Sequence, residues 1–216
     1  MIKIFCSLQS DLLPLPKKGM SNPAFMTVYF EGEQRELKSL YGKMKRLQER
    51  QKPLVENGFY NPTRWLGNLV VRLGYSWKKV YCRGTWDSLT LQENHLCFST
   101  ETAWNPPFDL LKLIQKVYPS FRFYFEAEGD WDEYVTNDAE GRYFTNRFVV
   151  DTEPDIEYFD TIEKASAHLA KFIGKPVAAN WGALYQAAED WNELHEDSDW
   201  PIDVKQISVI GNDELW

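Results

Sequence analysis

Residues 121–128 alternate between aromatic or small residues and polar ones, and this pattern constrains the fold more than any other in the sequence. Successive side chains of a β-strand point to opposite faces of a sheet. One side of this segment carries three phenylalanines, and the other side carries Arg122, Tyr124 and Glu126. The alternation predicts a strand whose phenylalanine face packs under helices, with the polar side chains on the opposite face.

Two strands and a helix are predicted just before this segment. Residues 86–91 and 96–102 are two strands joined by a short polar turn, which is typical of a hairpin. Asn105 then caps a helix that has Pro106 and Pro107 in its first turn and that ends at Pro119. Residues 82–129 are therefore expected to run strand, strand, helix, strand.

The first third of the chain supplies the remaining elements of this core. Residues 25–30 are rich in β-branched and aromatic residues and predict a strand, and residues 33–51 have the spacing of an amphipathic helix. Asn61 followed by Pro62 opens an extra helix over residues 62–73. The order is β-α-β-β-α-β, so we expect an α+β fold of the ferredoxin-like type, an antiparallel sheet with helices on one face.

Further elements extend this core. Residues 134–136 and 143–150 are expected to form a second hairpin around a polar turn. Asp160 and Glu163 resemble a capping box, which opens the first of two C-terminal helices. A last strand is expected near residues 204–210.

Three segments describe the expected domain organisation. Residues 1–22 contain several prolines and form a leader. Residues 23–150 form the ferredoxin-like domain, and residues 151–216 form a C-terminal helical extension packed on the same domain.

Composition excludes several classes of protein. The three cysteines (Cys6, Cys82 and Cys97) are odd in number and widely spaced, so they provide neither a disulfide framework nor a metal-ligand set. The apolar start of the chain is too short for a secretory signal peptide, and no apolar run reaches the length of a transmembrane helix. We expect a cytoplasmic protein with no membrane partner.

The net charge of −8 is unevenly distributed along the chain. Residues 1–85 hold 15 Lys and Arg against 6 Asp and Glu, whereas residues 86–216 hold 9 against 26. Such an asymmetry indicates a partner-facing surface, unless the two halves neutralise each other in the fold. A group of basic residues lies near the C-terminal end of the first predicted helix, where their charge complements the helix macrodipole. A nucleic-acid contact is a minor alternative role for them. They are Lys43, Lys45, Arg46, Arg50 and Lys52.

No residue pattern predicts catalysis, a metal or a cofactor. The sequence lacks the phosphate-binding, dinucleotide-binding, nucleophile-elbow and zinc-binding motifs. The acidic residues 151–157 superficially resemble a calcium loop, but they lack its glycine and contain Pro154. The alternating acids of residues 126–132 are better explained as a solvated sheet edge than as an acid–base pair.

Three short motifs resemble a known family. They are Gly-Thr-Trp-Asp at residues 84–87, Thr-Ala-Trp-Asn-Pro-Pro at residues 102–107 and Glu-Ala-Glu-Gly at residues 126–129. In this order and spacing they are similar to the YubB-like ferredoxin-domain family of bacterial proteins, which are often borne on phages or plasmids. The family usually has a lysine inside the first motif and a serine at position 105. The resemblance covers residues 76–150 and implies the fold, but no assigned activity.

The same motifs supply a candidate ligand or partner surface. Trp86 and Trp104 each stand beside a turn or capping group, so they either lock the hairpin and the helix entry or line a pocket at one end of the sheet. The polar face of residues 121–128 is a second candidate, although its carboxylates repel phosphate and disfavour nucleic acid there. The full candidate set is Thr85, Trp86, Asp87, Thr102, Trp104, Arg122, Tyr124, Glu126 and Glu128.

Three functional hypotheses follow from these observations. The first is a non-enzymatic interaction or accessory protein of mobile-element type, with another protein as its partner. The second is an inhibitor that mimics nucleic-acid charge, because residues 126–163 hold 13 acids and only 2 bases. The third is a small-ligand enzyme or hydrolase that uses Asp87, Glu126 or Glu128, and it requires Asp87, Trp104 and Glu126 to converge in space.

Overall fold

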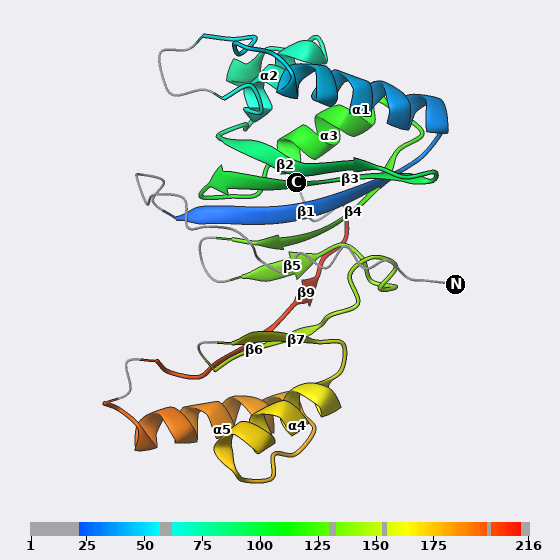
Figure 1. The fold of residues 1–216 in the computed structure, drawn as a ribbon. Coiled ribbons are helices and arrows are strands. Elements are labelled where there is room, and N and C mark those ends of the chain that lie inside the picture. Colours follow the sequence, from blue (N-terminus) through cyan, green and yellow to red (C-terminus); the bar gives the residue numbers. More distant parts are fainter. Residues whose placement is uncertain (1–21, 57–61, 130–132, 153–154, 198–199, 213–216) are drawn as a thin grey trace.

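The computed structural model describes residues 22–56, 62–129, 133–152, 155–197 and 200–212. Within them the chain forms an α+β structure with a six-stranded mixed sheet and a separate three-stranded sheet (Figure 1). The expected leader, residues 1–22, lies outside the described residues except for Asn22.

The larger sheet and its helices come mainly from the first 136 residues. In chain order these elements are β1 (Pro23–Glu31), α1 (Gln34–Gln48), α2 (Leu66–Arg72), the short 3-10 helix η1 (Trp77–Lys79), β2 (Gly84–Leu91), β3 (His95–Ala103), α3 (Phe108–Val117), β4 (Arg122–Glu128) and β5 (Tyr134–Thr136). The strand order is β2-β3-β1-β4-β5-β9, and the first five strands pair antiparallel with their neighbours. The central strand β1 therefore lies between β3 and β4.

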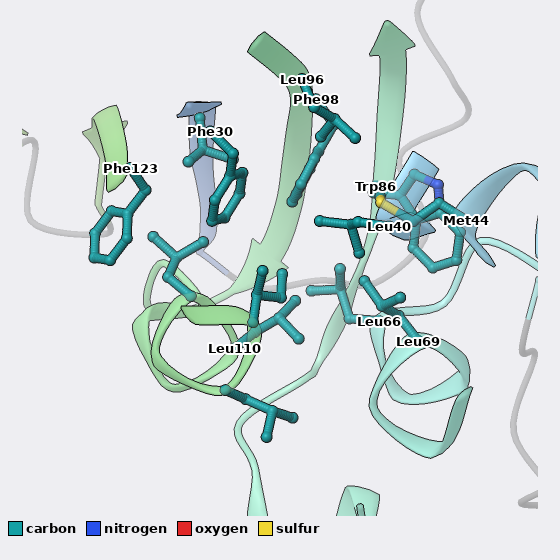
Figure 2. Packing of buried hydrophobic residues seen from close by; sticks show 14 of the residues in the cluster. Phe30, Leu40, Met44, Leu66, Leu69, Trp86, Leu96, Phe98, Leu110 and Phe123 are labelled. Atoms are coloured by element: carbon teal, nitrogen blue, oxygen red, sulfur yellow. The ribbon is translucent and has the colours of Figure 1, made fainter. Parts of the chain in front are cut away.

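One face of this sheet packs under α1, α2 and α3. The three phenylalanines of the 121–125 segment are at most 3% exposed, as the alternation predicts. Figure 2 shows side chains of β1, β3 and β4 pointing toward leucines of α2 and α3. Burying each large apolar side chain stabilises the fold by about 1.5–3 kcal/mol. The core contains, among others, Phe30, Leu40, Met44, Leu66, Leu69, Trp86, Leu96, Phe98, Leu110 and Phe123.

The C-terminal part forms a second unit with its own core. It contains β6 (Phe148–Asp151), β7 (Ile156–Phe159), α4 (Ile162–Ile173), α5 (Trp181–Leu194) and β8 (Asp203–Gln206), and its strands are ordered β7-β6-β8. The helices α4 and α5 lie at the opposite end of the molecule from α1, α2 and α3 (Figure 1). The core of this unit contains Val150, Ala165, Leu169, Leu184, Ala188, Ile202 and Val204. The segment expected to be a helical extension therefore contributes strands as well as helices.

Two connections join the units. The short strand β9 (Ser208–Val209) pairs parallel with β5 at the edge of the larger sheet. A small apolar cluster of Tyr134, Val149 and Ile207 lies between the sheets, and the Tyr134 ring meets Tyr158 edge-on at 6.3 Å. The expected single strand over 204–210 is thus two strands, β8 and β9, which belong to different sheets.

The prediction of a hairpin between residues 134–136 and 143–150 is wrong. β5 pairs with β4 and β9, whereas β6 pairs with β7 and β8. The reason is that the side-chain amide of Asn137 forms the hydrogen bonds to β4 that further residues of β5 would otherwise form. Its Oδ1 accepts the Phe125 N–H at 2.7 Å, and its Nδ2 donates to the Phe123 carbonyl at 2.9 Å. The backbone groups of β4 are thereby satisfied, and the chain leaves the sheet.

Three predicted helix starts are also wrong. α2 begins at Leu66 rather than near residue 62, because Trp65 is extended and bridges to Thr85 of β2; Asn61 lies outside the described residues. α3 is preceded by Pro107 and not by Asn105, whose carbonyl instead accepts the Thr102 hydroxyl at 2.7 Å. The cap of α4 is Thr161, whose hydroxyl oxygen accepts the Lys164 N–H at 3.4 Å, and Asp160 instead forms an ion pair with the Lys164 side chain.

The core of the larger unit predicts a clear difference between two Phe→Ala substitutions. Phe98 is fully buried in β3, so Phe98→Ala leaves a cavity and is expected to lower the free energy of unfolding by about 3–5 kcal/mol. Phe172 in α4 is 46% exposed, so Phe172→Ala is expected to lower it by less than about 1 kcal/mol. Urea unfolding monitored by circular dichroism measures both, and equal losses would contradict this assignment of the core.

Candidate functional site

The helix-free face of the larger sheet carries most of the predicted site residues. Cross-strand pairing places Asp87, Ser99, Thr27 and Glu126 in one row across β2, β3, β1 and β4. Neighbouring strands lie about 4.8 Å apart, so Asp87 and Glu126 are separated by roughly 14 Å. The structure therefore puts these two carboxylates on one face and does not bring them together. Thr85, Arg122, Tyr124 and Glu128 share this face by the same alternation.

The other predicted residues have structural surroundings. Trp86 is fully buried on the helix-facing side, and its indole N–H has no hydrogen-bond partner among the described residues. Thr102 is also buried, and its hydroxyl contacts the carbonyls of Ala24 and Asn105. Asp87 forms an ion pair with Arg64 at 2.6 Å. Trp104 is 43% exposed beyond the end of β3, with a positive φ of 75°, and it does not converge with Asp87 and Glu126 on a common pocket.

An aromatic cluster occupies the centre of the helix-free face. The segment that follows β5 lays Tyr143 flat on Tyr29 of β1, with ring centroids 4.2 Å apart and planes 12° apart. The Tyr143 ring also contacts His95 and Tyr124, at 5.5 and 5.4 Å. Its hydroxyl donates to the carboxylate of Glu31. The segment therefore covers the part of the sheet that an external ligand would otherwise contact.

Charged groups at the edge of this cluster strengthen the attachment. Arg142 forms an ion pair with Glu31 at 2.8 Å, and its guanidinium lies over the Tyr124 ring at 5.8 Å. Burial raises the pKa of Tyr143, and the hydrogen bond to Glu31 raises it further. Burial lowers the pKa of His95, although the nearby Glu31 charge opposes this change. The tyrosine stays protonated at neutral pH and serves as a hydrogen-bond donor.

Asp138 fixes the backbone of the covering segment. The side chain is 1% exposed, and its two carboxylate oxygens accept the N–H groups of residues 142, 143 and 144 at 2.7–3.0 Å. Gly141 has a φ of +68°, which turns these N–H groups toward the carboxylate. Arg147 adds hydrogen bonds to four carbonyl oxygens of the same segment, those of residues 138, 139, 144 and 146. The segment is thus held by charge-assisted hydrogen bonds rather than by strand pairing.

Glu126 lies beneath this segment with a perturbed carboxyl group. Burial raises its pKa to about 7, the nearby Asp138 charge raises it further, and Arg147 opposes both effects. Its Oε2 atom is buried and has no hydrogen-bond partner among the described residues. A carboxyl group with these surroundings is partly protonated near neutral pH.

The arrangement offers little chemistry. No group of three or more His, Cys, Asp or Glu side chains in the described part of the chain is arranged to hold a metal ion. Burial raises the pKa of the Cys82 thiol to about 11, so it is a poor nucleophile.

The helices α4 and α5 and the segment after α5 carry several exposed apolar side chains and acids, and we call these residues together the α5 surface. Tyr185 is 48% exposed, Leu194 71% and Trp200 59%, and Phe172 stacks obliquely on Trp191 at 5.8 Å. Five acids lie among them, all on the exposed side: Glu189, Asp190, Glu193, Glu196 and Asp197.

Charge is separated between the two ends of the molecule. The helical layer of the larger unit (residues 33–83 and 108–117) holds 14 Lys and Arg against 5 Asp and Glu. Residues 148–212 hold 4 against 13. Because the two helical layers lie at opposite ends (Figure 1), the asymmetry along the sequence is also an asymmetry in space. The halves do not neutralise each other by contact between these layers.

Sequence reasoning missed Tyr143, Asp138 and the α5 surface. Asp138 and Gly141 carried a turn signal, which we interpreted as the loop of a hairpin. The stacking partner of Tyr143 is 114 residues away along the chain, so no local pattern reveals it. The exposure of Trp200 and Tyr185 likewise depends on tertiary packing.

Comparisons with family models, with curated proteins and with solved structures find no match for this chain. None of the helices in the described residues is long and apolar enough to span a bilayer.

The raised pKa of Glu126 predicts an unusual pH dependence of stability. Between pH 4.5 and about 7 the folded protein keeps a proton that the unfolded chain has released, so the free energy of unfolding falls as the pH rises through this range. The Glu126→Gln variant has no carboxyl group at this position, so its free energy of unfolding should not show this fall with rising pH. Relative to the wild type, we expect the variant to gain about 2 kcal/mol between pH 4.5 and about pH 8, measured by urea unfolding.

Glu101→Gln is the matched control, because Glu101 lies on the same sheet face in β3 and is not paired with β4. The control is expected to show a smaller pH-dependent change than Glu126→Gln. A stability difference between Glu126→Gln and wild type that is the same at both pH values would overturn the assignment.

Proposed function

We propose that this chain is a non-enzymatic interaction or accessory protein of mobile-element type that acts in the cytoplasm. The proposal includes a ferredoxin-like domain of the YubB-like family as its larger unit. Two features support this fold assignment. The strands β2-β3-β1-β4 are antiparallel, and the element order from β1 to β4 is β-α-β-β-α-β with one inserted helix. The three motifs at 84–87, 102–107 and 126–129 support the family.

The observation that carries the functional proposal is the α5 surface. Tyr185, Leu194 and Trp200 are all exposed there, and exposed large apolar side chains are a feature of surfaces that associate with other proteins. The surrounding carboxylates favour a partner whose contact surface is basic, because complementary charge raises the rate and the specificity of association. The partner is therefore a protein with a cationic surface that also presents apolar side chains.

The charge at the end of α5 strengthens this proposal. A helix C-terminus carries a partial negative charge, and basic residues in the last turn stabilise it. The last turn of α5 has no basic residue and instead contains Glu193, with Glu196 and Asp197 directly after it. These acids destabilise the free protein, and a bound cation would remove that penalty.

The two alternative functions have weaker support. An inhibitor that mimics nucleic acid needs its acids on the surface, but Asp138 is 1% exposed and Glu126 is partly buried. An enzyme that uses Asp87 and Glu126 needs both carboxylates to contact the same substrate, but they are about three strand spacings apart in the sheet.

Neutralising the acids at the end of α5 is expected to stabilise the free protein. In Glu193→Gln/Glu196→Gln, each substitution removes an unfavourable interaction with the helix macrodipole, so the free energy of unfolding should rise by about 0.3–1 kcal/mol per site. Urea unfolding at low ionic strength measures the change. Loss of stability in this variant would indicate that the two acids hold the fold together instead.

Trp200→Ala tests the binding surface itself. An affinity pull-down with the tagged full chain, followed by quantitative mass spectrometry, is expected to recover a protein partner whose yield falls at least about fivefold in this variant, since exposed tryptophans commonly dominate binding energy. Trp104→Ala is the matched control, because Trp104 is similarly exposed on the larger unit. Equal yields from both variants, or no partner that depends on Trp200, would contradict the proposal.

A further inference from the structure

A lysine-lined pocket lies within the helical layer of the larger unit, far from the α5 surface. Its volume is about 320 Å³, and it lies between α3 and the segment that contains η1. The apolar side chains of Val80 and Leu113 contribute to its lining. The polar lining consists of Tyr75, Ser76, Lys79, Asp109, Lys112 and Lys116.

Positive charge dominates this pocket. Three lysines line it against one carboxylate, Asp109, and that carboxylate is also within reach of the Tyr81 N–H at 3.4 Å. No carboxylate in the described residues forms an ion pair with Lys79 or Lys116. The ammonium groups of Lys79 and Lys116 line the same pocket and repel each other, and an anion bound between them would remove this repulsion.

A flat ring lies at the same pocket. Tyr75 is 38% exposed, and the Nζ of Lys116 lies over its ring at 5.6 Å from the centroid. An exposed tyrosine ring beside cations is the combination on which proteins stack nucleobases while they bind the attached phosphate. Ser76 adds a hydroxyl that can donate a hydrogen bond to a phosphate oxygen.

The rest of the helical layer favours the same ligand. Its excess of nine positive charges attracts polyanions, although the chain as a whole is acidic. The acids of the C-terminal unit lie at the opposite end of the molecule (Figure 1), where they repel a polyanion and so orient it toward the helical layer. The helix-free sheet face carries Glu126 and Glu128 and is covered in part by Tyr143, so it does not compete for this ligand.

We propose that the pocket between α3 and η1 binds a nucleotide, with its phosphate on Lys79, Lys112 and Lys116 and its base on the ring of Tyr75. The nucleotide is either free or part of a single-stranded nucleic acid, and both present the same phosphate and base. The proposal does not depend on the protein partner at the α5 surface, because the two surfaces share no residue.

Fluorescence anisotropy with the full chain tests the proposal. Labelled single-stranded RNA and DNA of about ten nucleotides are titrated at low salt, and a nucleoside monophosphate and inorganic phosphate serve as competitors. Lys79→Ala/Lys116→Ala is compared with Lys171→Ala/Lys175→Ala, which changes the charge equally at exposed positions of the C-terminal unit. Urea unfolding of each variant checks that it folds.

The pocket variant is expected to bind the strand at least about tenfold more weakly at low salt. The slope of log binding constant against log salt concentration should be shallower by roughly 1.4, because each lost phosphate contact on a single strand contributes about 0.7. The control variant should stay within about twofold of wild type. Tyr75→Ala should weaken binding of the strand and of the monophosphate by about fivefold or more, but leave competition by inorganic phosphate unchanged.

The competitors distinguish the two sources of the ligand. A strand that binds far more tightly than the monophosphate identifies single-stranded nucleic acid, and equal affinities identify a free nucleotide; both outcomes support the pocket. Equal losses in the pocket and control variants, no binding of any probe at about 50 mM salt, or an unchanged affinity in Tyr75→Ala would overturn the proposal.

Discussion

Burial of one face of the six-stranded sheet under α1, α2 and α3 is the constraint on which the rest of the structure depends. Phe30, Phe98 and Phe125 lie on that face in three adjacent strands, and all are fully buried. Because side chains alternate along a strand, fixing these residues against the helices also fixes which residues point away from them. Tyr29, Glu31 and Glu126 therefore share the helix-free face as a consequence of this alternation.

The helix-free face is then closed by side-chain hydrogen bonds in place of a further strand. The side-chain amide of Asn137 forms hydrogen bonds with backbone groups of β4. The carboxylate of Asp138 accepts hydrogen bonds from the N–H groups of residues 142–144. The chain can therefore cross the sheet and place Tyr143 on Tyr29. Glu126 beside this segment is partly buried, and this burial raises the pKa of its carboxyl group. The perturbed carboxyl is a consequence of this burial and not by itself a sign of catalysis.

Charge separation links the two units to binding. The basic helical layer and the acidic C-terminal unit present opposite potentials at the two ends of one molecule. Unfavourable features remain at both ends, namely acids at the negative end of α5 and the like charges of Lys79 and Lys116 at one pocket. Features that reduce the stability of the free protein are expected where a ligand or partner compensates for them. The two surfaces lie on separate units, so the proposed protein partner and the proposed nucleotide would not compete for one site.

Local sequence patterns predicted the strands β1–β4 of the larger unit, the face that each of them buries and the existence of α1, α2 and α3, although not where α2 and α3 begin. These follow from local periodicity, as in the 121–128 segment, and the expected helix-facing phenylalanines are indeed buried. The uneven charge was also evident from the sequence. The path of residues 137–151 depends on tertiary contacts. Asn137 acts through hydrogen bonds to β4 and Asp138 through hydrogen bonds within its own loop, and a turn signal in the sequence does not distinguish these from a hairpin. The tertiary structure also decided that Asp87, Trp104 and Glu126 stay apart, since their separation depends on the order of strands in the sheet and not on their spacing in the chain.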